Sequence, residues 1–262
     1  MTHNQKFSQF SVDAAKIRES GGWEALNKKI IFLAESAESS DEWQAQQHGA
    51  LCFQVFSEYM RLQEVYTAER ADTSLLAWRA RNLLELCVWS TYFVRSRENA
   101  RRLCEGAGRD AIDLLNAFES WGKKTEQPVD WLSTIANGKS DLSDRAATEG
   151  IENLSGKYMN VSNAADECGL KERFIILNKL LSKFAHPTVM QILGMVDDNK
   201  TRLQLDTFYE LGCNFFVNAF NALEKSISFV GDDLKTTYYA SQSARAIGWF
   251  YWVCCKSKPH PA

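Results

Sequence analysis

The chain has 262 residues, of which 45% are hydrophobic and 24% charged, and its formal net charge is −3. This length suits one large domain or two small ones, and the apolar fraction is ordinary for a globular protein. The slightly negative charge argues against a protein devoted wholly to nucleic acid, although local basic faces stay compatible with RNA. Only four prolines and fourteen glycines punctuate the sequence, which favours long helices.

Targeting signals and cysteines predict a cytoplasmic protein. The opening MTHNQKFSQF contains no apolar run, so no signal peptide is expected. The apolar run at 246–255 is about half as long as a membrane span requires, so no membrane association is expected. The seven cysteines are scattered and include no CxxC pair, which is typical of reduced thiols.

The first predicted elements are helices that lead to a central one. Apolar residues at helical spacing predict a helix over 23–36 and a long helix from about 42 to 68. Asp72 or one of the two residues after it can cap the next helix. From Leu83 to Val94 that helix is almost wholly apolar, which predicts burial nearly all round with Glu85 as one internal carboxylate.

The later elements complete an all-α bundle. The central helix is expected to continue into a further helical segment near residue 118, with Gly106 and Gly108 as breaks. A less regular region follows near 123–161, and Ser162 is the expected N-cap of a short helix after it. Further helices are predicted at 171–186, 203–229 and 234–255. We therefore expect about seven main helices in a single domain over residues 1–262, with no strand and no repeat.

The helix over 171–186 carries the most informative pattern. Its apolar stripe is expected to bury most of the helix, and consists of Phe174, Ile175, Ile176, Leu177, Leu180, Leu181 and Phe184. Asn178, Ser182 and His186 follow one another at four-residue spacing along one side. Pro187 disfavours helical geometry at His186 and should end the helix there. Such a polar row either caps and cross-links a helix end or lines a functional cleft.

A second polar group is expected on the central helix. Arg81 and Asn82 precede Glu85 by about one turn, so they lie on its side of the helix. A lone carboxylate among apolar residues is costly to bury unless it is paired. Glu85 is therefore predicted to pair with an Arg of its own helix or with a polar group on the 171–186 helix.

Most catalytic and cofactor motifs are absent or incomplete. The G-x-G-x-x-A pattern at 106–111 follows a helix instead of a strand, which disfavours a dinucleotide site. His48 and Cys52 lie one turn apart but lack a second pair of ligands, so a half-exposed His beside a buried Cys is expected. Arginines over 95–102 are interspersed with Glu and predict a solvated face, with a contact to RNA phosphate as the alternative. The sequence predicts no metal site, no cofactor and no DNA-binding signature.

Two family resemblances follow from these motifs. Arg81-x-x-x-Glu85 on a buried helix, with Ser182-x-x-x-His186-Pro187 at a later helix end, resembles an uncharacterised group of bacterial helical proteins. The helical pattern also resembles the HEPN superfamily, which implies dimeric ribonucleases of toxin or phage-defence systems. That family's active site places an Arg four to six residues before a His on one helix. In this chain the corresponding positions are 179–181, where Lys179 is basic and none is Arg.

Three functions are compatible with the sequence. The first is a helical bundle that acts through a protein partner or as a homo-oligomer, with the aromatic GWFYW segment at 248–252 as an interface. The second is a HEPN-like RNA-binding protein or ribonuclease. The third is a bundle that binds a small ligand between its two central helices, in a pocket lined by Trp78, Trp89 and the polar row of the 171–186 helix.

The ribonuclease hypothesis assigns roles to specific residues. His186 would be the general acid or base, and Ser182 and Asn178 would position the substrate. The catalytic candidates are His186, Ser182 and Glu85. The binding candidates are Arg81, Asn82, Asn178, Lys179 and Lys183.

Overall fold

A computed structural model describes residues 43–148, 150, 154, 159–186 and 198–225. These residues form seven helices and no strand, so the predicted all-α class is confirmed. The expected helices at 23–36 and 234–255, with the GWFYW segment, lie outside the described residues. The helices are α3 Trp43–Thr67, α4 Thr73–Phe93, α5 Arg97–Lys124, α6 Val129–Thr148, α7 Val161–Glu167, α8 Lys171–Ala185 and α10 Asp198–Lys225.

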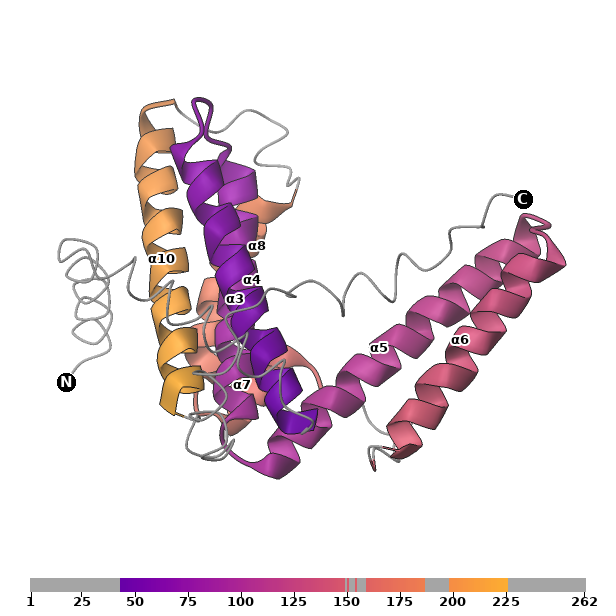
Figure 1. Ribbon diagram of the computed structural model, residues 1–262. Coiled ribbons are helices and arrows are strands. Elements are labelled where there is room, and N and C mark those ends of the chain that lie inside the picture. The colour runs from indigo at the N-terminus through magenta and orange to yellow at the C-terminus, as the bar shows by residue number, and fades with distance from the viewer. Residues whose placement is uncertain (1–42, 149, 151–153, 155–158, 187–197, 226–262) are drawn as a thin grey trace, which may run out of the picture.

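The core of the bundle surrounds α4, which packs against α3, α7, α8 and α10 (Figure 1). Buried side chains cover most of the circumference of α4, but the side that carries Trp78, Glu85 and Trp89 is only partly buried, so the predicted burial nearly all round is too wide. Aromatic rings join α3 to α10, where Tyr59 stacks on Phe216 with centroids 4.1 Å apart. Tyr66 stacks on Tyr209 in the same way, with centroids 3.9 Å apart. The predicted central helix is thus the centre of the fold.

Side-chain caps fix where three helices begin. Asp72 accepts hydrogen bonds from the backbone N–H groups of Ser74 and Leu75, which confirms its predicted role. Ser96 caps α5 in the same manner. The prediction of Ser162 as the cap of α7 is wrong, because Asn160 accepts the bond instead and the helix begins two residues earlier.

The predicted breaks at Gly106 and Gly108 are wrong, because α5 runs through both without interruption. A helical glycine costs only about 1 kcal/mol relative to alanine, which a long helix tolerates. Gly108 is also required by packing, because an added Cβ would lie only 2.6 Å from Leu154 Cδ2. The glycine lets the chain after α6 approach α5.

The less regular region expected near 123–161 is instead largely helical. Over half of it is α6, whose backbone N–H groups at Trp131 and Leu132 bond to the carbonyl of Pro128. Proline is compatible with a helix start, because the first N–H groups have no partner within the helix. The Ser, Asp and Asn residues of α6 lie mostly on its exposed sides.

Helices α5 and α6 form an antiparallel hairpin that projects away from the bundle (Figure 1). Their crossing is tight at Gly122, where an added Cβ would collide with the ring of Trp131. Trp131 also meets Trp121 and Phe118 edge to face, with centroids 5.6 and 6.4 Å apart. The hairpin therefore has a small aromatic core of its own.

Helix α8 is buried on one side only, so the expectation that most of it is buried is wrong. Phe174, Leu177 and Leu181 face the core. Ile176, by contrast, is 67% exposed, and Ile175 and Leu180 are also exposed. The helix therefore has two apolar sides. Helix α4 covers the side with Phe174, and the side with Ile176 is exposed to solvent. None of the described helices is sufficiently long and apolar to cross a membrane.

Candidate functional site

Arg81 of α4 joins residues that the sequence singled out on two helices. Its Nε donates to Asn178 Oδ1 over 2.8 Å. Its Nη2 lies 2.9 Å from Glu85 Oε1 one turn further along α4, which confirms the predicted pairing of Glu85. Its Nη1 lies 3.4 Å from Nε2 of His186. We call these four residues the Arg81 cluster.

Helix geometry explains why the cluster forms. Arg81 and Glu85 are four residues apart and project from one side of α4. Asn178 and His186 are eight residues apart, so they lie about two turns apart on one side of α8. The last helical residue is Ala185, and His186 is extended, with φ −120° and ψ 148°, as predicted for a residue before proline. The imidazole therefore lies at the end of α8, within reach of α4.

The cluster is accessible to solvent. The side chain of Arg81 is 25% exposed and that of Glu85 is 30% exposed. His186 is exposed as well. The expectation that Glu85 is an internal carboxylate is therefore wrong, because α8 leaves this side of α4 partly uncovered. Solvent therefore reaches part of the Arg81 side chain and His186.

The contact with Arg81 determines which nitrogen of the His186 imidazole can accept a hydrogen bond. A guanidinium is only a donor, so a hydrogen bond from Arg81 makes Nε2 of His186 the acceptor. In such a bond the ring has the tautomer that carries its proton on Nδ1. An acceptor nitrogen beside a fixed cation is a suitable arrangement for proton transfer next to a bound anion.

The other predicted site residues do not contact the Arg81 cluster through any hydrogen bond or ion pair described for them. Ser182 is partly buried on α8, one turn before His186, and has no hydrogen-bond partner within the part of the chain that the structure describes. Lys179 and Lys183 are exposed on α8. Asn82 does not join the Arg81 cluster, because its Nδ2 donates to Glu58 Oε1 over 3.0 Å.

Glu58 is the buried carboxylate that the sequence analysis missed. Its side chain is 7% exposed and lies 2.7 Å from Arg79 Nη1 and 3.3 Å from Arg61 Nη1. Arg79 also lies over the ring of Trp78, 4.4 Å from its centroid. The missed signal was available, since Glu58 falls between Val55 and Leu62 on the apolar face of α3. These contacts link α3 to α4.

His48 is buried, not half-exposed as expected. Its exposed fraction is 2%, and its Nε2 donates to the carbonyl oxygen of Leu223 on α10 over 2.9 Å. Nδ1 lies 3.7 Å from Cys52 Sγ. Burial lowers the pKa of His48, and the bond to Leu223 opposes that shift. The buried, neutral ring therefore cross-links α3 and α10.

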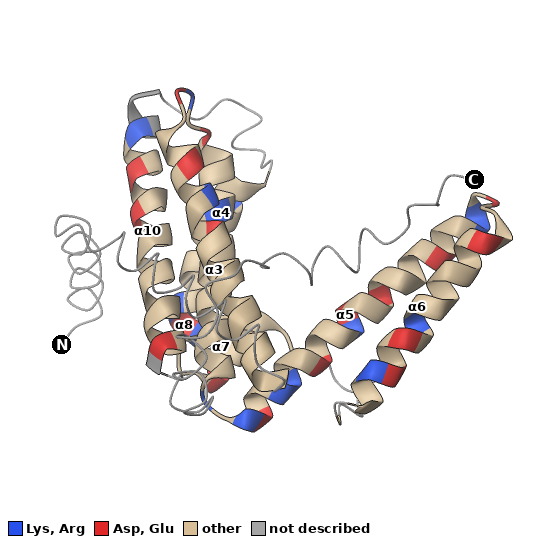
Figure 2. Ribbon diagram, in the orientation of Figure 1, with Lys and Arg blue, Asp and Glu red and all other residues tan. Residues whose placement is uncertain are grey.

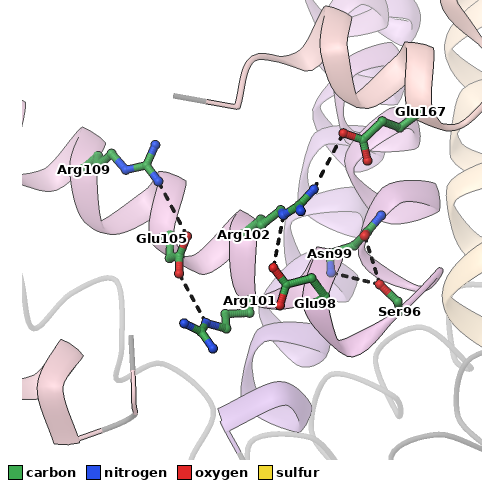
Figure 3. A network of polar contacts seen from close by, with 8 residues as sticks. All are labelled: Ser96, Glu98, Asn99, Arg101, Arg102, Glu105, Arg109 and Glu167. Carbon is green, nitrogen blue, oxygen red and sulfur yellow. Dashed lines mark hydrogen bonds and ion pairs between the residues drawn. The ribbon is translucent and has the colours of Figure 1, made fainter. Parts of the chain in front are cut away.

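The arginines at the start of α5 belong to a network of ion pairs (Figure 3). Arg102 pairs with Glu98 at 3.2 Å and with Glu167 at 3.8 Å. Glu105 lies between two arginines, at 3.3 Å from Arg101 and 3.6 Å from Arg109. The three carboxylates balance the charge of Arg101, Arg102 and Arg109.

Neither metal clusters nor relatives identify the site. Across the described ranges, no group of three or more His, Cys, Asp or Glu side chains is arranged to hold a metal ion. No protein-family model, curated protein or solved structure matches the chain. The function must therefore be argued from the residues themselves.

Proposed function

We propose that the Arg81 cluster binds RNA and cleaves its phosphodiester bonds, with Arg81 holding the phosphate and His186 transferring protons. The observation that carries this proposal is the 3.4 Å approach of Arg81 Nη1 to the exposed imidazole of His186. The HEPN likeness calls for an Arg and a His on one helix, and α8 supplies only the His. The Arg comes from α4 instead.

Arg81 is held ready for a phosphate. Asn178 fixes Nε and Glu85 fixes Nη2, so the planar fork has a defined orientation before any ligand binds. Guanidinium groups suit phosphate because they donate two parallel hydrogen bonds. Lys179 and Lys183, exposed on the same helix as His186, add positive charge for neighbouring phosphates.

His186 is the acid–base group of this proposal. Its acceptor Nε2 can take the proton of a ribose 2′-hydroxyl as that oxygen attacks the adjacent phosphorus. The protonated ring can then return the proton to the departing 5′-oxygen. Arg81 would stabilise the negative charge that develops on the phosphate oxygens.

The test is a cleavage assay on a labelled single-stranded RNA. We expect the parent chain to cleave it, and His186→Ala to lose at least a hundredfold in rate while still binding. Arg81→Lys keeps the charge but loses the fork, so both affinity and rate should fall. Arg70→Ala is the matched control, because Arg70 is an exposed arginine without a partner among the described residues.

Two results would contradict the proposal. One is a parent chain that neither binds nor cleaves RNA. The other is a folded His186→Ala variant that cleaves as fast as the parent. A loss of stability in Arg81→Lys without any RNA phenotype would instead show that the Arg81 cluster only cross-links α4 and α8.

A second candidate function is action through protein contacts. The observation that favours it is the set of large apolar side chains exposed on the α5–α6 hairpin, which projects from the bundle (Figure 1). Contiguous exposed apolar surface is typical of interaction sites. A co-purified partner or a mass above that of one chain would support it, and a strictly monomeric, partner-free protein would not.

A further inference from the structure

One side of α5 carries a partly exposed apolar stripe, whose two aromatic rings also contact Trp131 of α6 edge to face. Leu114, Phe118 and Trp121 recur at four- and three-residue spacing, so they share one side of the helix. They are 56%, 45% and 53% exposed, respectively. Helix α6 lies against the adjacent side of α5, which carries Leu115 and Gly122. We call the three exposed residues the α5 stripe.

Unpaired charges run along one flank of the α5 stripe. Asp113 and Lys124 are eleven residues apart, which is about three helical turns, so they lie on the same flank. Asp110 lies about one turn before Asp113. Among the described residues none of these three has an ion-pair or hydrogen-bond partner. Figure 2 shows acidic and basic residues interspersed along the hairpin.

We propose that the α5 stripe is the contact between two copies of this chain, paired antiparallel about a twofold axis near Phe118. The proposal rests on the second candidate function and names its partner and surface. A twofold axis at that point places Leu114 of one copy near Trp121 of the other. The two hairpins then form an antiparallel four-helix arrangement.

The charges are complementary to this pairing. In antiparallel helices a flank meets the same flank of the other copy. Lys124 of one copy therefore lies opposite Asp110 and Asp113 of the other, because the midpoints of these pairs fall within about one residue of Phe118. Parallel pairing would instead bring this charged flank against the other flank of α5, where α6 lies, so the three charges would not meet their complements. The apolar and charged patterns thus fit one partner, a second copy.

The test is the mass of the full chain in solution, measured by sedimentation equilibrium over a range of concentrations. One chain weighs 29.8 kDa, and two copies weigh 59.6 kDa. We expect the parent to form the dimer and Phe118→Arg to be monomeric, because that change places two cations at the axis. Phe53→Arg is the matched control, since Phe53 is 54% exposed on α3 and should leave the dimer intact.

Charge reversal gives a second test that does not change the apolar stripe. Lys124→Glu should weaken the dimer about tenfold or more. Adding Asp110→Lys and Asp113→Lys to that variant should restore it, because the reversed pattern is again complementary.

Three outcomes would overturn the proposal. One is a parent that is monomeric at all concentrations, and another is a folded Phe118→Arg variant that stays dimeric. The third is a dimer that Lys124→Glu weakens but that the added Asp110→Lys and Asp113→Lys changes do not restore. A monomeric parent whose melting temperature falls in Leu114→Arg would show that the chain covers the stripe with its own residues, whereas Phe118→Arg would also disturb the contact with Trp131. None of these outcomes bears on RNA cleavage by the Arg81 cluster, so the two proposals fail separately.

Discussion

Arg81 and Glu58 show how differently two charged residues of one bundle are used. Arg81 contacts three side chains and is still one-quarter exposed, so a ligand can compete for it. Glu58 is enclosed by arginines and an amide, with 7% of its side chain exposed. The first group is accessible for binding, whereas the second is committed to holding α3 against α4.

The first prediction at this scale concerns Glu58. Glu58→Gln keeps the shape but removes the charge that Arg79 needs, and Arg79 is itself only 17% exposed. We expect the free energy of unfolding to fall by about 3 kcal/mol. The matched change Glu98→Gln, in an exposed pair with Arg102, should cost less than about 1 kcal/mol. Equal costs in urea denaturation would show that Glu58 is not a buried cross-link.

His48 makes stability depend on pH. Burial lowers its pKa below the ordinary value of 6.5. Above pH 6.5 the ring is neutral in both folded and unfolded chains. As the pH falls below 6.5, the unfolded chain takes up a proton before the folded chain does, so the free energy of unfolding falls by at most about 1.4 kcal/mol per pH unit.

His48→Gln tests this dependence, because its amide N–H can still donate to the carbonyl of Leu223 but does not titrate. The variant should lose less stability than the parent between pH 7 and pH 5.5, as measured by chemical denaturation. A parallel fall in parent and variant would show that other groups cause the pH dependence.

At the scale of elements, the close approach of α3 and α10 depends on Gly212. An added Cβ there would lie 2.5 Å from Cδ2 and 2.9 Å from Cδ1 of Leu62, which is fully buried. Gly212→Ala should therefore lower the free energy of unfolding by about 1–3 kcal/mol through overpacking. In Gly106→Ala nothing lies within 4 Å of the new methyl group, so that helix should become slightly more stable. The two melting temperatures should move in opposite directions, and a shift in the same direction would contradict this packing.

The sequence predicted these elements well where a local pattern sets them. The apolar run of α4 and the proline after His186 both act within a few residues, so the central helix and the end of α8 were predicted. The unbroken helix at the α5 glycines and the exposure of Ile176 depend on which residues pack nearby, and spacing along one helix does not reveal that. Glu58 is different, because its place on the apolar face of α3 was a local signal, and only its partner Arg79 lies on another helix.

At the scale of the whole molecule, the candidate site depends on the packing of α4 beside α8. The sequence predicted Arg81, Asn178 and His186 as separate candidates, and it predicted the contact between Arg81 and Glu85 on one helix. It did not predict that Arg81 would reach His186, because the two residues are 105 positions apart. The projecting hairpin and the Arg81 cluster give the molecule two separate surfaces, each with its own proposed partner.

The most direct test is whether a phosphodiester contacts His186 beside Arg81. The chain has four histidines, so their imidazole NMR signals can be assigned by substitution. Adding a 2′-deoxy oligonucleotide, which lacks the attacking hydroxyl, should shift the His186 signal and leave that of buried His48 unchanged. Arg81→Lys should greatly reduce the shift, whereas Arg70→Ala should not. A His186 signal that stays in place at saturating oligonucleotide, or that shifts equally in Arg81→Lys, would contradict a phosphate site at the Arg81 cluster.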